Sequence, residues 1–333
     1  MSTRMRAAVI TRPGGPEVLE VRDVDRPTPG TGEVLVRVNA SALNRADLLQ
    51  RQGRYPAPAG APADIPGLEL AGEVAELGQG ATLWKRGDRV FGIVGGGGNA
   101  EYAVAHERAL ARVPERLSWT DAGAIPEAFI TAHDALVTQA QLRPSDIVLI
   151  HAVGSGVGLA AIQLARAAGA IPYGDARTSD KIERARAIGL EDGVVVAGDL
   201  DVIAKQVARW THGAGVNVVL DLAGGPYAVV SVHAAAPRGR ILLIGTIAGA
   251  EAALPLHLIM GKRLTIRGTV LRARPLEEKI VATREFAAQV VPLLARGVVR
   301  PIVDRVFSLD QIADAHRHLE GNATFGKVVI TLT

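Results

Sequence analysis

The sequence predicts an α/β protein in which a doubly wound parallel sheet is inserted into a β-rich domain. The chain has 333 residues, enough for two domains with substantial cores. Its first third is dominated by strand and turn signals, and from about residue 123 to 262 short apolar runs alternate with helical stretches. The segment after residue 262 adds little to the parallel sheet, so we expect it to complete the first domain.

The β-rich region begins with a strand near Ala7–Ile10, whose apolar run is too short for a signal peptide. Residues 33–39 alternate apolar and polar side chains, which is typical of a strand with one buried face. Four prolines between Tyr55 and Pro66 predict an extended surface loop, and Gly95–Gly98 predicts a second flexible connection.

The central region predicts parallel strands joined by right-handed helical crossovers. The expected strands are 147–150, 171–175, 194–196, 216–220 and 241–244, and the expected helices are 158–168, 179–188 and 202–210. The apolar stretch 147–165 is about as long as a membrane span. A glycine cluster divides it into a strand, a tight turn and a helix, so we expect no membrane segment.

The composition excludes several classes of protein. Without cysteine there is no disulfide framework, catalytic thiol or cysteine-ligated zinc. The 37 basic residues are dispersed among 34 acidic ones, which does not favour nucleic-acid binding. The eight histidines show no metal spacing and no Ser/His/Asp arrangement, and we expect His316 and His318 at the surface. Together with the N-terminal apolar run that is too short for a signal peptide, these features predict a cytoplasmic, enzyme-sized protein.

A glycine turn lies between the strand 147–150 and the following helix, where a Rossmann-type sheet binds the pyrophosphate of a dinucleotide. The turn contains Gly154, Ser155, Gly156, Val157 and Gly158. It does not satisfy the literal G-x-G-x-x-G pattern, so an ordinary tight turn remains the alternative. Its position between a buried strand and a buried helix favours the dinucleotide.

The residues at the end of the next strand bear on the choice between NAD and NADP. Some of them favour NAD and others favour NADP. Asp175 is suited to the ribose hydroxyls of NAD. Arg177 and Lys181, with Thr178, are suited to the 2′-phosphate of NADP. A solvent-exposed loop of mixed charge is the alternative for each residue.

Four segments carry a resemblance to a known family: Ala40–Gly53, Gly67–Gly72, Ala124–Ala132 and Ser155–Gly158. With them the chain resembles, nearly end to end, the zinc-independent quinone oxidoreductases (zeta-crystallin-like) of the medium-chain dehydrogenase/reductase superfamily. It looks closest to the branch of the p53-inducible NADPH quinone oxidoreductase.

The resemblance implies a Rossmann nucleotide-binding domain at 123–262, inserted into a GroES-like catalytic domain formed by 1–122 and 263–333. It also implies a homodimer, formed by strand addition near Thr265–Leu271. At the positions of the catalytic zinc ligands this chain has Asn44, Leu68 and Glu127. Because leucine cannot bind zinc and an uncharged amide binds it poorly, we expect a zinc-independent enzyme.

The resemblance also implies the site residues. Asn44, Tyr55 and Glu127 correspond to the substrate side, with a turn, a loop anchor and a helix-dipole partner as their respective alternatives. The implied cofactor residues outside the glycine turn and its neighbouring strand are Thr131, Gly224, Gly245, Thr246 and Arg272.

NADP(H) is favoured over NAD(H) because Lys181 matches the family's phosphate-side lysine, although Ala197 replaces a tyrosine that is usual there. The implied reaction is hydride transfer from NAD(P)H to a quinone, and reduction of an enal or enone is the alternative. A nucleotide-binding sensor with little turnover is a further alternative.

Overall fold

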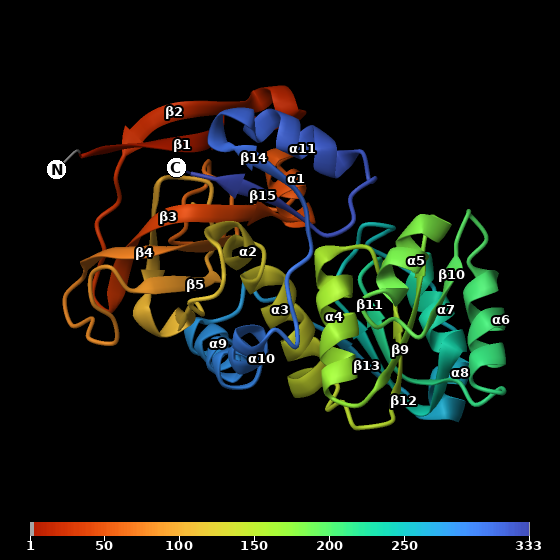
Figure 1. The fold of residues 1–333 in the computed structure, drawn as a ribbon. Coiled ribbons are helices and arrows are strands. Elements are labelled where there is room, and N and C mark those ends of the chain that lie inside the picture. The colour runs from red at the N-terminus through yellow and green to blue at the C-terminus, as the bar shows by residue number, and fades with distance from the viewer. Residues whose placement is uncertain (1–2, 333) are drawn as a thin grey trace. The chain divides into compact units, whose positions relative to one another are not determined.

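The computed structural model describes residues 3–332, and its chain forms two compact units (Figure 1). One unit combines the residues up to Ile130 with those from Leu271 onward, and the other is Thr131–Val270. The sequence predicts the inserted unit at 123–262. In the structure it extends past residue 262 because strand β13 (Thr265–Gly268) pairs with β12 (Ala235–Leu243).

The inserted unit contains a six-stranded, fully parallel sheet in the order β10-β9-β8-β11-β12-β13. The further strands are β8 (Ile147–Ile150), β9 (Ile171–Ala176), β10 (Asp192–Val195) and β11 (Val216–Asp221). This order is that of a dinucleotide-binding fold, in which the chain reverses direction across the sheet between the first and fourth strands. The fold class predicted from the sequence is confirmed.

Helices connect these strands and cover the sheet (Figure 1). They are α4 (Gly156–Ala167), α5 (Ser179–Arg186), α6 (Asp201–Trp210), α7 (Pro226–Ala234) and α8 (Leu256–Lys262). Strands β8 and β11 are buried on both faces, with Leu149 and Val219 fully inaccessible to solvent. The apolar stretch 147–165 forms β8 and most of α4, and within residues 3–332 no helix has the length and apolarity needed to cross a membrane.

The other unit is β-rich, and the carboxyl-terminal segment completes it. Strand β15 (Lys327–Thr331) pairs antiparallel with β3 (Glu33–Leu43), so the blue end of the chain lies beside the orange strands (Figure 1). The other strands are β1 (Arg4–Ile10), β2 (Leu19–Asp25), β4 (Glu69–Leu77), β5 (Arg89–Ile93), β6 (Tyr102–His106), β7 (Leu110–Arg112) and β14 (Val303–Ser308).

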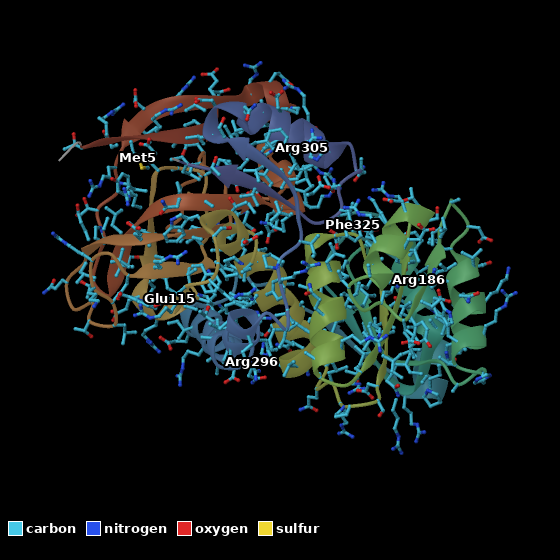
Figure 2. All side chains as sticks on the ribbon, viewed as in Figure 1. Met5, Glu115, Arg186, Arg296, Arg305 and Phe325 are labelled. Atoms are coloured by element: carbon cyan, nitrogen blue, oxygen red, sulfur yellow. The ribbon has the colours of Figure 1, made fainter. Side chains whose placement is uncertain are left out.

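The helices of this unit are α1 (Arg45–Arg51), α2 (Trp119–Gly123), α9 (Leu276–Gln289), α10 (Val291–Arg296) and α11 (Ile312–Glu320). Helix α3 (Pro126–His133) spans the division between the two units. Basic side chains such as Arg186, Arg296 and Arg305 are exposed (Figure 2).

The expectation that His316 lies at the surface is wrong. It belongs to the face of α11 that packs on the core, together with Ile312 and Leu319, and it is fully buried. Its Nδ1 lies 3.2 Å from the guanidinium of Arg51, and burial together with that positive charge lowers the pKa of His316 to about 3. The neighbouring His318 is partly exposed, with its Nε2 2.6 Å from Asp304.

Candidate functional site

The glycine turn joins β8 to α4 as the sequence predicts. Ser155 caps the helix, its hydroxyl accepting a hydrogen bond from the Gly158 amide at 3.1 Å. A Cβ at Gly158 would lie 2.8 Å from the Ala152 carbonyl oxygen and 3.0 Å from Val153 Cα. The start of α4 therefore packs against the turn, and only glycine fits there. This arrangement leaves the first amides of a 12-residue helix at the carboxyl edge of the sheet, where they suit a pyrophosphate.

Asp175 lies near the end of β9 and points into the protein rather than into solvent. Its side chain is 2% exposed; Oδ2 lies 2.5 Å from Nδ1 of His151, and Oδ1 accepts a hydrogen bond from the Ala152 amide at 3.2 Å. This placement does not favour the predicted contact with a ribose. Arg177 and Thr178 lie just beyond the strand and are exposed, and Lys181 on α5 is half-buried.

His151 connects Asp175 to Ser231, so the structure does bring together a Ser/His/Asp set that the sequence analysis did not find. The Nε2 of His151 lies 3.0 Å from Ser231 Oγ, whose hydroxyl donates to the Tyr227 carbonyl at 2.9 Å. Ser231 and His151 are fully buried, so no substrate reaches the hydroxyl and the set is structural. Burial lowers the pKa of His151, but the charge and hydrogen bond of Asp175 outweigh it and the net shift is upward.

The turns that follow β11 and β12 pack against each other and bring three predicted cofactor residues together. A Cβ at Gly224 would lie 2.5 Å from the Gly245 carbonyl oxygen and 2.8 Å from Thr246 Cα. The Asp221 carboxylate holds the first turn by accepting from the amides of Ala223 and Gly224 at 2.9 and 2.8 Å. At this edge Thr246 is exposed, Gly245 is half-buried and Gly224 is buried, and backbone at such a strand end suits the nicotinamide half of a dinucleotide. Thr131, the remaining predicted residue of this unit, is buried on α3.

In the β-rich unit, Asn44 belongs to a buried ionic network centred on Glu69 and Lys327. The Lys327 ammonium donates to Glu69 Oε1 at 2.7 Å, to Asn44 Oδ1 at 2.6 Å and to the Leu43 carbonyl at 3.1 Å. Asn44 Nδ2 also donates to Glu69 Oε1, at 2.8 Å. Both ends of the Asn44 amide are thus engaged inside the protein, which does not favour its predicted role as a donor to substrate.

The same network reaches the third predicted catalytic residue through its backbone. Glu69 Oε2 accepts from the Glu127 amide at 2.8 Å, which fixes the start of α3. Glu69 is fully buried and Lys327 is 5% exposed. The sequence analysis did not assign a function to either residue. A lysine at the start of an otherwise apolar final strand was the available signal for Lys327, because a buried ammonium requires a partner.

The three positions that the resemblance aligns with zinc ligands hold an amide, a leucine and a carboxylate. Leu68 is buried at 2% exposure, and Asn44 is already bound to Lys327. Among residues 3–332, no group of three or more His, Cys, Asp or Glu side chains is placed to hold a metal ion.

Arg272 contacts Tyr55 and connects it to two neighbouring segments. Its guanidinium donates to the Gly95 carbonyl at 2.8 Å and to Gln50 Oε1 at 2.6 Å, and its Cζ lies 5.1 Å from the centre of the Tyr55 ring. Arg272 is 3% exposed, so this geometry favours a role in holding Tyr55 over the predicted contact with the cofactor. Tyr55 itself is half-buried; burial raises the pKa of its phenol, while Arg272 opposes that rise.

Asp47 ties the start of α1 to the strand that carries Glu69. Its carboxylate accepts from the Asn44 amide at 2.7 Å and from the Gly67 amide at 2.9 Å. It is fully buried, and desolvation raises its pKa to about 6 in spite of these two bonds.

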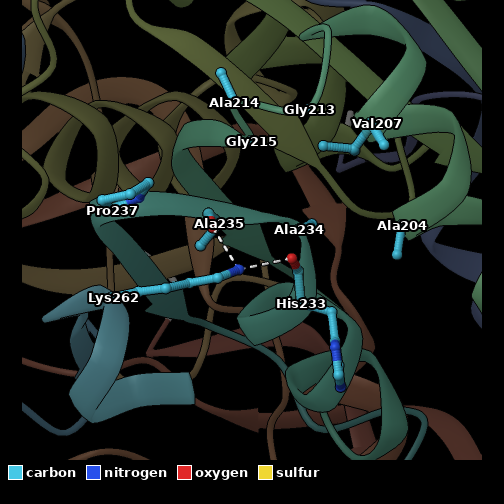
Figure 3. A pocket seen from close by; sticks show the side chains of 11 residues that line it. Ala204, Val207, Gly213, Ala214, Gly215, His233, Ala234, Ala235, Pro237 and Lys262 are labelled. Atoms are coloured by element: carbon cyan, nitrogen blue, oxygen red, sulfur yellow. Dashed lines mark hydrogen bonds between the residues drawn. The ribbon is translucent and has the colours of Figure 1, made fainter.

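A pocket of about 260 Å³ lies in the inserted unit, at the amino ends of β11 and β12 and so at the opposite edge from the glycine turn (Figure 3). Lys262 lines it, but its ammonium donates to the carbonyls of Val232, His233 and Ala235 at 3.0, 2.8 and 2.7 Å. All three protons are therefore used to cap the end of α7, and the lysine is structural.

Comparisons with known proteins agree with this geometry. Residues 30–115 match the family model described as alcohol dehydrogenase GroES-like domain, and residues 192–330 match the one described as zinc-binding dehydrogenase. A human quinone oxidoreductase is 30% identical over 334 residues, covering 98% of each chain. A quinone oxidoreductase of Pseudomonas aeruginosa is 33% identical over 320 residues, covering 95% of this chain and 96% of the other.

Solved structures show the same fold over the whole chain. The Pseudomonas syringae quinone oxidoreductase has a TM-score of 0.87 at 29% identity, covering 98% of this chain and 100% of the other. A mycobacterial protein described as a complex with NADPH has a TM-score of 0.89 at 26% identity, with the same coverage. The chain therefore belongs to the quinone oxidoreductase family of the medium-chain dehydrogenase/reductase superfamily.

Proposed function

We propose that this protein is an NADPH-dependent, zinc-independent quinone reductase. The observation that carries the proposal is the glycine turn, in which Ser155 and Gly158 present the start of α4 at the carboxyl edge of a parallel sheet. A relative of the same fold that is described as a complex with NADPH supports it. So do the two cations, Arg177 and Lys181, that follow the second strand of the sheet.

The residues of the chain have distinct roles in this proposal. The turn Ser155–Gly158 binds the pyrophosphate, and the backbone at Gly224, Gly245 and Thr246 holds the nicotinamide half. When bound, the dihydronicotinamide supplies a hydride. Tyr55, held by Arg272, is the hydrogen-bond donor to the substrate carbonyl, where negative charge develops during the reduction. Glu127 and Asn44 act through the Glu69 network that positions the start of α3.

The absence of a catalytic zinc site in this proposal rests on residue chemistry. The three positions hold Asn44, Leu68 and Glu127, although one matching family model is described as zinc-binding. Without a Lewis acid to polarise an alcohol, the better substrates are already electrophilic. Quinones satisfy this requirement, and so do the conjugated double bonds of enals and enones.

We also propose an oligomeric state, a cellular location and a branch of the family for this enzyme. Strand β13 is at the edge of the parallel sheet, and nearby Leu256, Met260 and Val270 are 67%, 75% and 50% exposed. An unpaired strand edge with apolar neighbours suits strand addition between two copies, so we propose a homodimer. We carry over from the sequence a cytoplasmic location, and from the four segments that carry the resemblance a place in the p53-inducible branch.

The test is a substrate panel with the purified, metal-analysed protein. We expect oxidation of NADPH by 1,4-benzoquinone and 1,4-naphthoquinone, with no loss of rate after incubation with a strong chelator. Faster turnover of an alkenal than of either quinone would assign the enzyme to double-bond reduction. Tight binding of NADPH without turnover of any electrophile would assign it to a nucleotide-binding sensor. Stoichiometric zinc would contradict the zinc-independent mechanism.

A further inference from the structure

The residue that enters the glycine turn has an unfavourable backbone conformation. Ala152 has a φ of +56°, a region that residues with a Cβ rarely occupy. Such a conformation persists only where the surroundings hold it. The turn that is to bind the cofactor therefore needs an anchor, and the contacts around Ala152 identify one.

The anchor is Asp175. Its Oδ1 accepts from the Ala152 amide at 3.2 Å, and its backbone carbonyl accepts from the Val153 amide at 2.9 Å. Its Oδ2 lies 2.5 Å from Nδ1 of His151, the residue just before the turn. One residue of β9 thus holds the three consecutive residues that follow β8.

His151 completes the anchor from the other side. Its backbone amide donates to the Leu220 carbonyl of β11 at 3.1 Å, and its Nε2 lies 3.0 Å from Ser231 Oγ on α7. His151 is fully buried and Asp175 is 2% exposed. Both carboxylate oxygens are therefore committed within the protein, on the side of the strand end away from solvent.

We propose that Asp175 and His151 are positioning residues that hold the glycine turn in its binding conformation, and that Asp175 does not discriminate NADH from NADPH. An acidic residue at this point of the sheet would ordinarily indicate a contact with the ribose hydroxyls and a preference for NAD. Here the carboxylate binds within the protein, so we assign the preference to two cations beyond it, the exposed Arg177 and the half-buried Lys181. The inference rests on the proposed function in one respect, namely that the turn binds a dinucleotide.

The test compares dissociation constants of NADPH and NADH, measured by fluorescence titration, for Asp175→Asn, Asp175→Ala and His151→Gln. Because both cofactors carry the same pyrophosphate, each variant is expected to bind both more weakly by the same factor, about tenfold for Asp175→Ala. Asp175→Asn keeps an acceptor for the Ala152 amide, so its loss is expected to be smaller. The ratio of the two dissociation constants stays within about twofold of wild type.

Arg177→Ala is the matched control, because it removes a neighbouring charge while Asp175 and His151 stay in place. It is expected to weaken the binding of NADPH and to leave the binding of NADH nearly unchanged. In steady state the Asp175 and His151 variants are expected to raise the KM of both cofactors with kcat retained at saturation. Unfolding temperatures show that the variants are folded, and hydrogen exchange at Ala152 and Val153 gives a second readout that needs no cofactor, with faster exchange expected.

Two results would overturn the inference. One is an Asp175→Asn variant whose affinity for NADPH relative to NADH rises tenfold or more, which would mean that the carboxylate does repel the 2′-phosphate. The other is a His151→Gln variant that binds both cofactors as wild type does and exchanges these amides at the wild-type rate. Failure of the proposed function is distinguishable, because then the wild-type protein binds neither cofactor.

Discussion

Replacing Lys327 by methionine isolates the buried network that connects Asn44, Glu69 and the start of α3. Methionine has a similar length but no charge, so the variant loses the bonds of the ammonium to Glu69 Oε1, Asn44 Oδ1 and the Leu43 carbonyl. Removing one member of a buried ion pair costs about 3–5 kcal/mol, because the other charge stays buried. Glu69 keeps its hydrogen bonds from Asn44 Nδ2 and the Glu127 amide. We therefore expect the free energy of unfolding to fall by about 3 kcal/mol, at the lower end of that range.

The assay is urea unfolding followed by tryptophan fluorescence, in a background that reports on one unit alone. Trp84 and Trp119 lie in the β-rich unit and Trp210 in the inserted one, so Trp210→Phe removes the signal of the latter. In that background Lys327→Met should lower the free energy of unfolding by about 3 kcal/mol. Glu69→Gln added to Lys327→Met should recover part of the loss, because it removes the unpaired charge.

A double-mutant cycle between Lys327 and Glu69 decides whether the reasoning holds. The account predicts a coupling well above the roughly 0–1 kcal/mol typical of exposed pairs. The buried ion pair would be refuted if Lys327→Met lowered the free energy of unfolding by less than about 1 kcal/mol and adding Glu69→Gln restored none of it.

Gly158→Ala places a Cβ 2.8 Å from the Ala152 carbonyl, so the dissociation constant of NADPH should rise at least about tenfold in fluorescence titration; unchanged affinity would contradict the packing argument. Burial raises the pKa of Asp47 from 3.8 to about 6, so its contribution to stability is greatest below about pH 4 and is lost as the pH rises through about 6. Asp47→Asn should therefore flatten the pH dependence of urea unfolding in that window, and an unaltered slope would contradict it. Met260→Glu puts a charge on a side chain that is 75% exposed near the edge strand, so sedimentation should show the proposed dimer dissociating; a wild-type monomer would contradict the interface.

The parallel sheet could be predicted because its strands are continuous apolar runs separated by a glycine turn and amphipathic helices. Helix α7 was not predicted, since Pro226–Ala234 is apolar almost throughout and shows no helical periodicity. Helix α8 buries none of its residues, and β14 keeps Arg305 and Val306 exposed, so neither produces a clear pattern. A helix is predicted from a periodic apolar face and a strand from an alternating or continuous apolar run, and none of these three elements shows the pattern of its own kind.

The candidate site was predicted at the level of its backbone and less well at the level of side-chain partners. The position of the turn at Ser155–Gly158 follows from its neighbours in sequence. The direction of the Asp175 carboxylate depends on His151, and the role of Asn44 depends on Lys327, 283 residues away. His316 was expected at the surface because nothing local indicates its contact with Arg51, 265 residues away. Such contacts are set by tertiary packing.

The proposed reaction is hydride transfer to a quinone from a nicotinamide bound at the glycine turn. Its most direct test is a single-turnover experiment, in which enzyme with one equivalent of bound NADPH is mixed with 1,4-naphthoquinone and the absorbance of the reduced nicotinamide is followed. The account predicts complete loss of that absorbance in one phase, slowed when the transferred hydrogen of NADPH is deuterium. Bound NADPH that persists in the presence of excess quinone would contradict the account.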